Sequence, residues 1–128
     1  LAQSLMEAVG IIVWVDDETD IDTVTAVSGS GPAYFFLFME AMQDAAKELG
    51  LSEELAKQLV YQTASGAADL AIQSKDTIAE LRRKVTSPGG TTERAINTFE
   101  AGEIRKLVNS ALVDAKKRSI ELSKEMKS

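Results

Sequence analysis

The residues best suited to chemistry lie in the segment 85–99, VTSPGGTTERAINTF. In this segment one proline and two glycines come directly before two threonines that open a helical pattern. Proline fixes its own φ and glycine adopts backbone angles closed to other residues, so we expect a sharp turn here. The first N–H groups of the following helix have no intrahelical partner, and a helix N-terminus carries about half a positive charge. The segment therefore predicts a site for a carboxylate or a phosphate, with threonine hydroxyls beside it.

The same residues also fit an ordinary capped helix that binds no ligand. Thr92 or Thr91 would then be the N-cap residue, and Glu93 would be the acidic residue of the first turn. A hydroxyl that caps its own helix is not free to contact a ligand, so the two interpretations give Thr92 different roles. The pattern alone leaves both interpretations open.

Composition limits the chemistry of this chain. The 128 residues are 45% hydrophobic, which is enough for one domain with a core, and they include no cysteine and no histidine. Disulfides, thiolate nucleophiles, zinc sites and imidazole acid–base catalysis are therefore excluded within the chain, and we expect no metal site. Any reaction must use hydroxyls, carboxylates, amines or a cofactor. The absence of cysteine is compatible with a reducing cytoplasm.

Charge is distributed unevenly along the chain. Residues 1–80 hold 14 acidic and 3 basic side chains, whereas residues 81–128 hold 6 acidic and 11 basic ones. These charges are either solvated helix faces or a basic end of one subunit that meets the acidic half of another. The net charge of −6 disfavours nucleic acid as a partner. The longest stretch without charge, residues 23–39, is interrupted by SGSGP and is shorter than the about 20 apolar residues of a membrane span, so we expect no membrane segment.

A helix is expected over residues 32–49, with Ser30 as its N-cap, Pro32 in its first turn and Gly50 just beyond its end. Its first two turns, AYFFLFM at residues 33–39, are apolar all round. A helix without a polar face must be enclosed on every side, so we expect it to form the core of a homodimer. SGSGP could also be a phosphate loop, but it lacks the Lys-Ser/Thr ending and a preceding strand.

Four further helices are expected downstream. They cover residues 53–74 after the N-cap Ser52, 77–84 after a capping box of Thr77 and Glu80, 92–100, and a long stretch beyond Gly102 whose tail from Lys116 should fray. Upstream, a helix end precedes the apolar run IIVWV at residues 11–15, which indicates a short buried strand. One strand cannot form a sheet, so its partner belongs to a missing α/β domain or to a second copy of the chain.

Taken in order, these segments resemble the pyrroline-5-carboxylate reductase family. The resemblance is carried by TAVSGSGPAYFFLFMEAM at residues 25–42, the GL-plus-acidic turn at 50–54, ASGAADL at 64–70, and the segment 85–99. It covers nearly all of the chain from Gly10 onward. The chain departs from the family at Thr77-Ile78, where His-Pro is frequent, and near Arg83, where an acidic residue is common.

The resemblance implies an all-α fold over residues 19–128, a helical dimerisation and substrate-binding domain of the 6-phosphogluconate-dehydrogenase-like type, preceded by one orphan β-strand. Residues 1–18 would be the end of a missing Rossmann-like dinucleotide-binding domain. The resemblance also implies a cytoplasmic homodimer with interleaved helices, or a higher oligomer of such dimers.

The activity implied by the resemblance is the reduction of 1-pyrroline-5-carboxylate to L-proline with NADPH or NADH. Thr92 would be the catalytic residue that hydrogen-bonds the ring nitrogen, and Val85, Ser87, Gly90, Thr91 and Thr92 would bind the substrate, with backbone N–H groups on its carboxylate. The glycine motif that binds the cofactor's phosphates is not in this chain, so the chain by itself should be inactive. The alternatives are a helical homo-oligomerisation module without a ligand, or the C-terminal domain of another two-domain NAD(P)H-dependent reductase.

Overall fold

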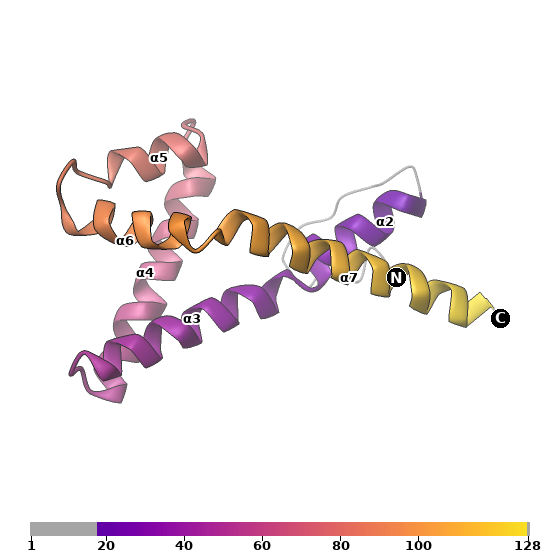
Figure 1. Cartoon of the computed structure of the whole chain (residues 1–128), viewed down its shortest axis with the longest axis horizontal. Coiled ribbons are helices and arrows are strands. Elements are labelled where there is room, and N and C mark those ends of the chain that lie inside the picture. The colour runs from indigo at the N-terminus through magenta and orange to yellow at the C-terminus, as the bar shows by residue number, and fades with distance from the viewer. Residues whose placement is uncertain (1–17, 128) are drawn as a thin grey trace. The chain divides into compact units, whose positions relative to one another are not determined.

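The computed structural model describes residues 18–127, and every regular element in this range is a helix (Figure 1). In chain order the elements are α2 (Glu18–Val24), the π-helix η1 (Thr25–Gly29), α3 (Gly31–Glu48), α4 (Glu53–Gln73), α5 (Ile78–Lys84), α6 (Thr91–Ala101) and α7 (Ile104–Lys127). The all-α prediction is confirmed for these residues. The strand expected at residues 11–15, and the helix end expected before it, lie outside the described residues.

The turn between α3 and α4 follows the sequence signals. Gly50 has a φ of 110°, and the next residue, Leu51, donates its N–H to the carbonyl of Ala46 at 3.1 Å, as in a Schellman motif. Ser52 is the N-cap of α4, and its Oγ accepts the N–H of Leu55 at 3.2 Å. Both helix boundaries lie within one residue of the prediction, because local capping chemistry determines them.

The segment before α3, Thr25–Gly29, is a π-helix, and a bend at Ser30 separates it from α3. The Ser30 N–H donates to the Thr25 carbonyl at 2.9 Å, which is a bond across five residues. The Tyr34 hydroxyl donates to the Ala26 carbonyl within this turn at 2.8 Å. Ser30 ends the π-helix with φ −90° and ψ −19°, so it lacks the extended backbone of the N-cap that we expected at this position.

Helix α7 is the long last helix that the sequence predicted, and it includes the tail that we expected to fray. The expected fraying from Lys116 onward is wrong, since α7 continues to Lys127 without a glycine or proline to interrupt it. The Arg118 guanidinium lies 3.1 Å from a Glu121 carboxylate oxygen and 3.6 Å from one of Glu125. Exposed ion pairs contribute at most about 1 kcal/mol each, so uninterrupted helix-forming residues are the main reason for the length.

The chain divides into two compact units. Unit 1 contains α2, η1, the start of α3 as far as Phe36, and α7, whereas unit 2 spans Leu37–Gly102. In unit 1, α7 packs against α2 and η1, and the Ser119 hydroxyl donates to Asp22 Oδ1 at 2.7 Å. This bond joins helices from opposite ends of the described sequence.

Each unit has a very small core. Among the described residues, the buried hydrophobic side chains are Ala26 in unit 1 and Ala56 and Val60 in unit 2. Phe38 of α3 and Phe99 of α6 pack in unit 2 with ring centroids 5.9 Å apart, yet they remain 44% and 42% exposed. Large hydrophobic side chains are normally among the residues that a folded domain encloses, so a single chain leaves most of its own core uncovered.

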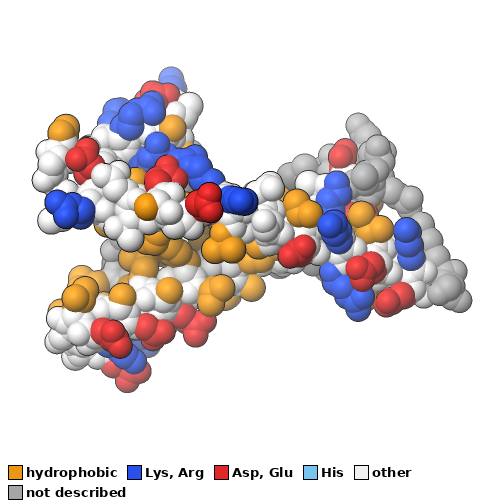
Figure 2. Space-filling model, in the orientation of Figure 1, with side chains coloured by type: hydrophobic (Ala, Val, Ile, Leu, Met, Phe, Trp, Pro, Cys, Tyr) orange, Lys and Arg blue, Asp and Glu red, His pale blue; other side chains and the backbone are white. Residues whose placement is uncertain are grey.

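Large hydrophobic side chains lie on the surface instead, as the orange patches of Figure 2 show. On α3, Phe35, Phe36 and Leu37 are 73%, 63% and 67% exposed. A second group lies along α7: Leu107, Val108, Val113, Leu122 and Met126. Exposed apolar surface of this extent marks an interaction site. None of the described helices is both long and apolar enough to cross a bilayer.

We expect the chain to be a homodimer at micromolar concentration, because association removes the exposed side chains of α3 and α7 from water. The interface should bury more than the about 2,000 Å² at which obligate interfaces begin. Light scattering tests this prediction, and a mass equal to the 13.8 kDa of one chain would contradict it. The Phe36→Asp variant places a charge on this surface and should weaken the dimer.

Candidate functional site

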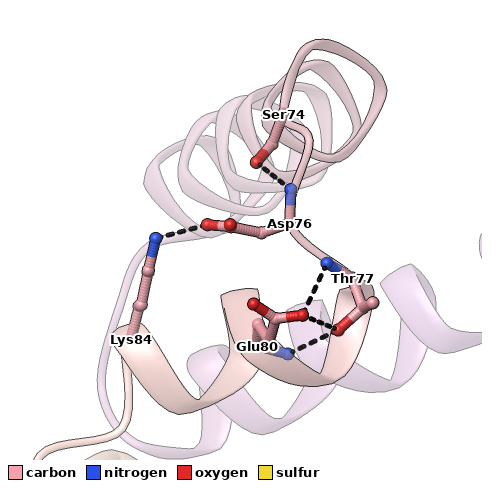
Figure 3. Close-up of polar contacts among 5 residues, drawn as sticks. All are labelled: Ser74, Asp76, Thr77, Glu80 and Lys84. Atoms are coloured by element: carbon pink, nitrogen blue, oxygen red, sulfur yellow. Dashed lines mark hydrogen bonds and ion pairs between the residues drawn. The ribbon is translucent and has the colours of Figure 1, made fainter.

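The segment that leads into the predicted anion turn is α5, and a capping box starts this helix (Figure 3). Thr77 Oγ1 accepts the Glu80 N–H at 3.2 Å, and Glu80 Oε1 accepts the Thr77 N–H at 3.4 Å. The predicted capping box is therefore confirmed. It fixes the start of α5 at Ile78.

An ion pair joins the two ends of this short helix. The Asp76 carboxylate, one residue before the N-cap, pairs with the ammonium group of Lys84, the last residue of α5 (Figure 3). The Asp76 N–H also donates to Ser74 Oγ at 3.0 Å. These contacts join the end of α4 to the start of α5, and the start of α5 to its last residue.

The loop from α5 to α6 contains a β-turn at residues 87–90. The Gly90 N–H donates to the Ser87 carbonyl at 3.0 Å, Pro88 is the second residue and Gly89, with a φ of 75°, is the third. Proline followed by a residue of positive φ is the pattern of a type II turn. The sharp turn that the sequence predicted is therefore present, and it requires glycine at position 89.

Gly90 has a different reason to be glycine. It is the N-cap of α6, with an extended backbone (φ −87°, ψ 179°) and no side-chain capping bond. A Cβ atom at this position would lie 3.2 Å from the Ser87 carbonyl oxygen, which is tighter than ordinary contact. The turn thus brings its own carbonyl too close to Gly90 for a side chain to fit without a shift.

The expectation that Thr91 or Thr92 caps the helix is wrong. Helix α6 begins at Thr91, one residue earlier than predicted, so the two threonines are its first and second residues. Glycine is an acceptable N-cap, and here the turn geometry selects it over threonine. Neither threonine hydroxyl has a hydrogen-bond partner among residues 18–127, and both side chains are exposed.

The backbone donors of the turn divide into used and unused groups. The Gly90 N–H is taken by Ser87, and the Gly89 N–H donates to Glu93 Oε1 at 3.0 Å. The N–H groups of Thr91 and Thr92 have no partner in the described part of the chain. The sequence predicted that backbone N–H groups of this turn bind a carboxylate. The Gly90 N–H is already hydrogen-bonded within the loop, whereas the N–H groups of Thr91 and Thr92 remain available to a ligand.

The five residues predicted to bind substrate lie in this one loop and the first turn of α6: Val85, Ser87, Gly90, Thr91 and Thr92. Val85 is 62% exposed and follows directly on α5, whose last turn carries Arg82, Arg83 and Lys84. No cluster of three or more acidic side chains that could hold a metal ion occurs within the described range. The geometry supplies backbone and hydroxyl donors, which suits a small anion.

Sequence reasoning missed two contacts around the site. The hydrogen bond from the Gly89 N–H to Glu93 could have been predicted from the sequence. An acidic residue at the third position of a helix commonly accepts a backbone N–H from the residues just before the helix. No sequence pattern predicts the Asp76–Lys84 ion pair, because the two residues are eight positions apart and are brought together only by the turn at the start of α5.

The chain is similar in sequence to known proteins along most of its length. The family described as pyrroline-5-carboxylate reductase dimerisation matches residues 18–122. A pyrroline-5-carboxylate reductase from Pseudomonas aeruginosa is 58% identical over 125 residues, which cover 98% of this chain and 46% of the relative. Pyrroline-5-carboxylate reductase 2 from Bacillus subtilis is 39% identical over 124 residues, which cover 97% of this chain and 44% of the relative.

Solved structures agree with this similarity. A pyrroline-5-carboxylate reductase from Coxiella burnetii has a TM-score of 0.86 and 50% identity, over 94% of this chain and 45% of that one. The pyrroline carboxylate reductase from Plasmodium falciparum, solved with NADP bound, has a TM-score of 0.80 and 37% identity, over 84% of this chain and 41% of that one. The chain spans less than half the length of each of these relatives.

The absence of a capping role for Thr92 predicts how stability responds to substitution. Thr92→Ala should change the free energy of unfolding by less than about 0.5 kcal/mol, because no hydrogen bond of the fold is lost. Thr77→Ala is the matched control, since it removes a hydroxyl that does cap a helix, and it should cost about 1 kcal/mol. Urea denaturation measures both values. Equal losses for the two variants would show that Thr92 also caps its helix.

Proposed function

Because this chain belongs to the pyrroline-5-carboxylate reductase family, we propose that it supplies the dimerisation and substrate-binding part of an enzyme that reduces 1-pyrroline-5-carboxylate to L-proline. The observation that carries the proposal is the start of α6. There the N–H groups and hydroxyls of two adjacent threonines, Thr91 and Thr92, are without partners among the described residues. These donors match what a small cyclic carboxylate requires.

The substrate is a planar five-membered imine that carries a carboxylate. Its reduction needs no protein nucleophile, since the protein has only to hold the ring, fix the carboxylate and favour the protonated imine that accepts a hydride. The N–H groups of Thr91 and Thr92 bind the carboxylate at the positive end of α6. The Thr92 hydroxyl, the second residue of the same turn, hydrogen-bonds the ring nitrogen, and Val85, Ser87 and Gly90 shape the rest of the pocket.

The electrostatic setting of the loop supports an anionic substrate. The last turn of α5 ends in Arg82, Arg83 and Lys84, directly before the loop. Lys84 is paired with Asp76, whereas no ion pair within the described residues involves Arg82 or Arg83. In a chain with a net charge of −6, these residues and the helix N-terminus provide the locally positive potential that a carboxylate needs.

The cofactor is NADPH or NADH, which supplies the hydride when it is bound. We propose that a preceding dinucleotide-binding domain, of which residues 1–18 are the end, holds most of it. Two findings support this arrangement: the relatives are more than twice as long as the chain they match, and the Plasmodium falciparum relative was solved with NADP bound. The sequence of this chain contains neither G-x-G-x-x-G nor G-x-x-x-x-G-K-[ST], the glycine motifs that bind nucleotide phosphates.

Assembly is part of the proposed function. The dimerisation family and the exposed side chains of α3 and α7 support a homodimer whose helices interleave, since the first two turns of α3 are apolar all round and need neighbours on every side. An oligomer of such dimers and the cytoplasmic location implied by the resemblance remain predictions.

In the full-length enzyme, Thr92→Ala should lower kcat/KM by about 10- to 100-fold. This is the loss of one hydrogen bond to a charged group, at roughly 1.5–3 kcal/mol. Thr92→Ser keeps the hydroxyl and should have a mild effect. Steady-state kinetics with 1-pyrroline-5-carboxylate measure this effect. Normal turnover in Thr92→Ala would favour the alternative that this domain is a helical oligomerisation module without a ligand in this loop.

The isolated 128-residue chain should neither bind NADPH tightly nor reduce the imine, whereas the full-length protein should do both. Isothermal titration of the isolated chain with NADPH is the direct measurement. Tight stoichiometric binding would overturn the assignment of the cofactor to a preceding domain.

A further inference from the structure

We propose that Glu93 is a positioning residue of the substrate loop. Its carboxylate holds the Gly89–Gly90 turn in the form that reserves the N–H groups of Thr91 and Thr92 for the substrate. The inference rests on the proposed function, which it deepens by naming the residue that determines where the substrate carboxylate binds.

The contact itself is specific. Glu93 is the third residue of α6, and its Oε1 accepts the Gly89 N–H at 3.0 Å. Its side chain is half-buried, whereas those of Thr92 and Arg94 on either side are exposed. A glutamate at this position commonly accepts the N–H of the N-cap residue. Here the N-cap N–H, that of Gly90, already donates to Ser87, so Glu93 binds the N–H one residue earlier.

This arrangement leaves no free N–H group at either glycine. Gly89 has a φ of 75° in a loop that contains two glycines, and glycine has more conformational freedom to lose than any other residue. Without the Glu93 carboxylate, the turn would sample other conformations, and the Gly89 N–H would become a competing donor for the substrate carboxylate. With the Glu93 carboxylate in place, the substrate carboxylate meets only the backbone N–H groups beside the Thr92 hydroxyl.

The charge of Glu93 and its role as an acceptor have opposite effects on the substrate. A second carboxylate at a helix N-terminus reduces the positive potential there and disfavours another anion. The benefit must therefore come from the hydrogen bond to Gly89, and variants can separate the two effects. Glu93→Gln keeps an acceptor oxygen without charge, Glu93→Asp keeps the charge on a shorter side chain, and Glu93→Ala removes both.

The test is steady-state kinetics of the full-length enzyme. Glu93→Ala and Glu93→Asp should raise the KM for 1-pyrroline-5-carboxylate by about 3- to 10-fold, the effect of one hydrogen bond, with kcat changed by less than about twofold. Glu93→Gln should stay within about twofold of the wild-type KM. An unchanged KM in both Glu93→Ala and Glu93→Asp would overturn the inference. A lowered KM in Glu93→Ala would also overturn it, because the carboxylate would then be a competitor of the substrate.

Glu80→Ala is the matched control. Glu80 is also the third residue of its helix and accepts a backbone N–H, that of Thr77 at 3.4 Å, outside the turn. This variant should lower the melting temperature and leave KM unchanged. If the wild-type enzyme reduces the imine and Thr92→Ala impairs it while the Glu93 variants keep a normal KM, only the present inference fails. If the wild-type enzyme has no activity on the imine, the proposed function fails and the inference fails with it.

Discussion

Exposed apolar surface on α3 is the constraint on which the rest of this molecule depends. Phe35, Phe36 and Leu37 lie in the first two turns of α3, which are apolar all round, and a single chain leaves all three side chains exposed. The buried hydrophobic residues of the described part are two alanines and a valine, which is far too little for a stable core. We therefore expect the helices to gain most of their stabilisation from a second copy of the chain, whereas capping side chains determine where α4 and α5 begin.

The loop at residues 85–92, where we propose that the substrate binds, shows how a short sequence can leave backbone donors available to a ligand. Pro88 and Gly89 form the turn, and a side chain at Gly90 would crowd the Ser87 carbonyl, with its Cβ 3.2 Å from the oxygen. As a result α6 starts without help from a side-chain cap, and both of its first two hydroxyls stay available. In the proposed site, the donors that the loop already uses would determine where a carboxylate binds.

The parts of the fold that could be predicted are those determined by neighbouring residues. Gly50, Ser52 and the Thr77–Glu80 capping box gave helix boundaries to within one residue, because caps act over one helical turn. The same logic failed at α6, where threonine is a common cap but the preceding turn made Gly90 the N-cap. The loop that contains the candidate site was identified from its residue types, whereas its free donors could be identified only from the structure.

Contacts between residues far apart in the chain could not be predicted from the sequence. The hydrogen bond from Ser119 to Asp22 joins residues 97 positions apart, and the Phe38–Phe99 pair joins two helices of unit 2. No periodicity or spacing specifies which polar or aromatic residues meet across helices. The exposed character of α3 could nevertheless be inferred, because an apolar run without a polar face is a property of the sequence itself.

The π-helix η1 places a tighter limit on the number of residues between α2 and α3 than on which amino acids they are. It accommodates a hydrogen bond over five residues between α2 and α3, so removing a single residue from Thr25–Gly29 could still leave a continuous helical backbone. Each residue in a helix contributes about 100° of rotation, however, and such a deletion would turn α2 away from the face on which Asp22 meets Ser119. Over evolutionary time, amino-acid replacements should therefore accumulate in this segment far more readily than single-codon insertions or deletions.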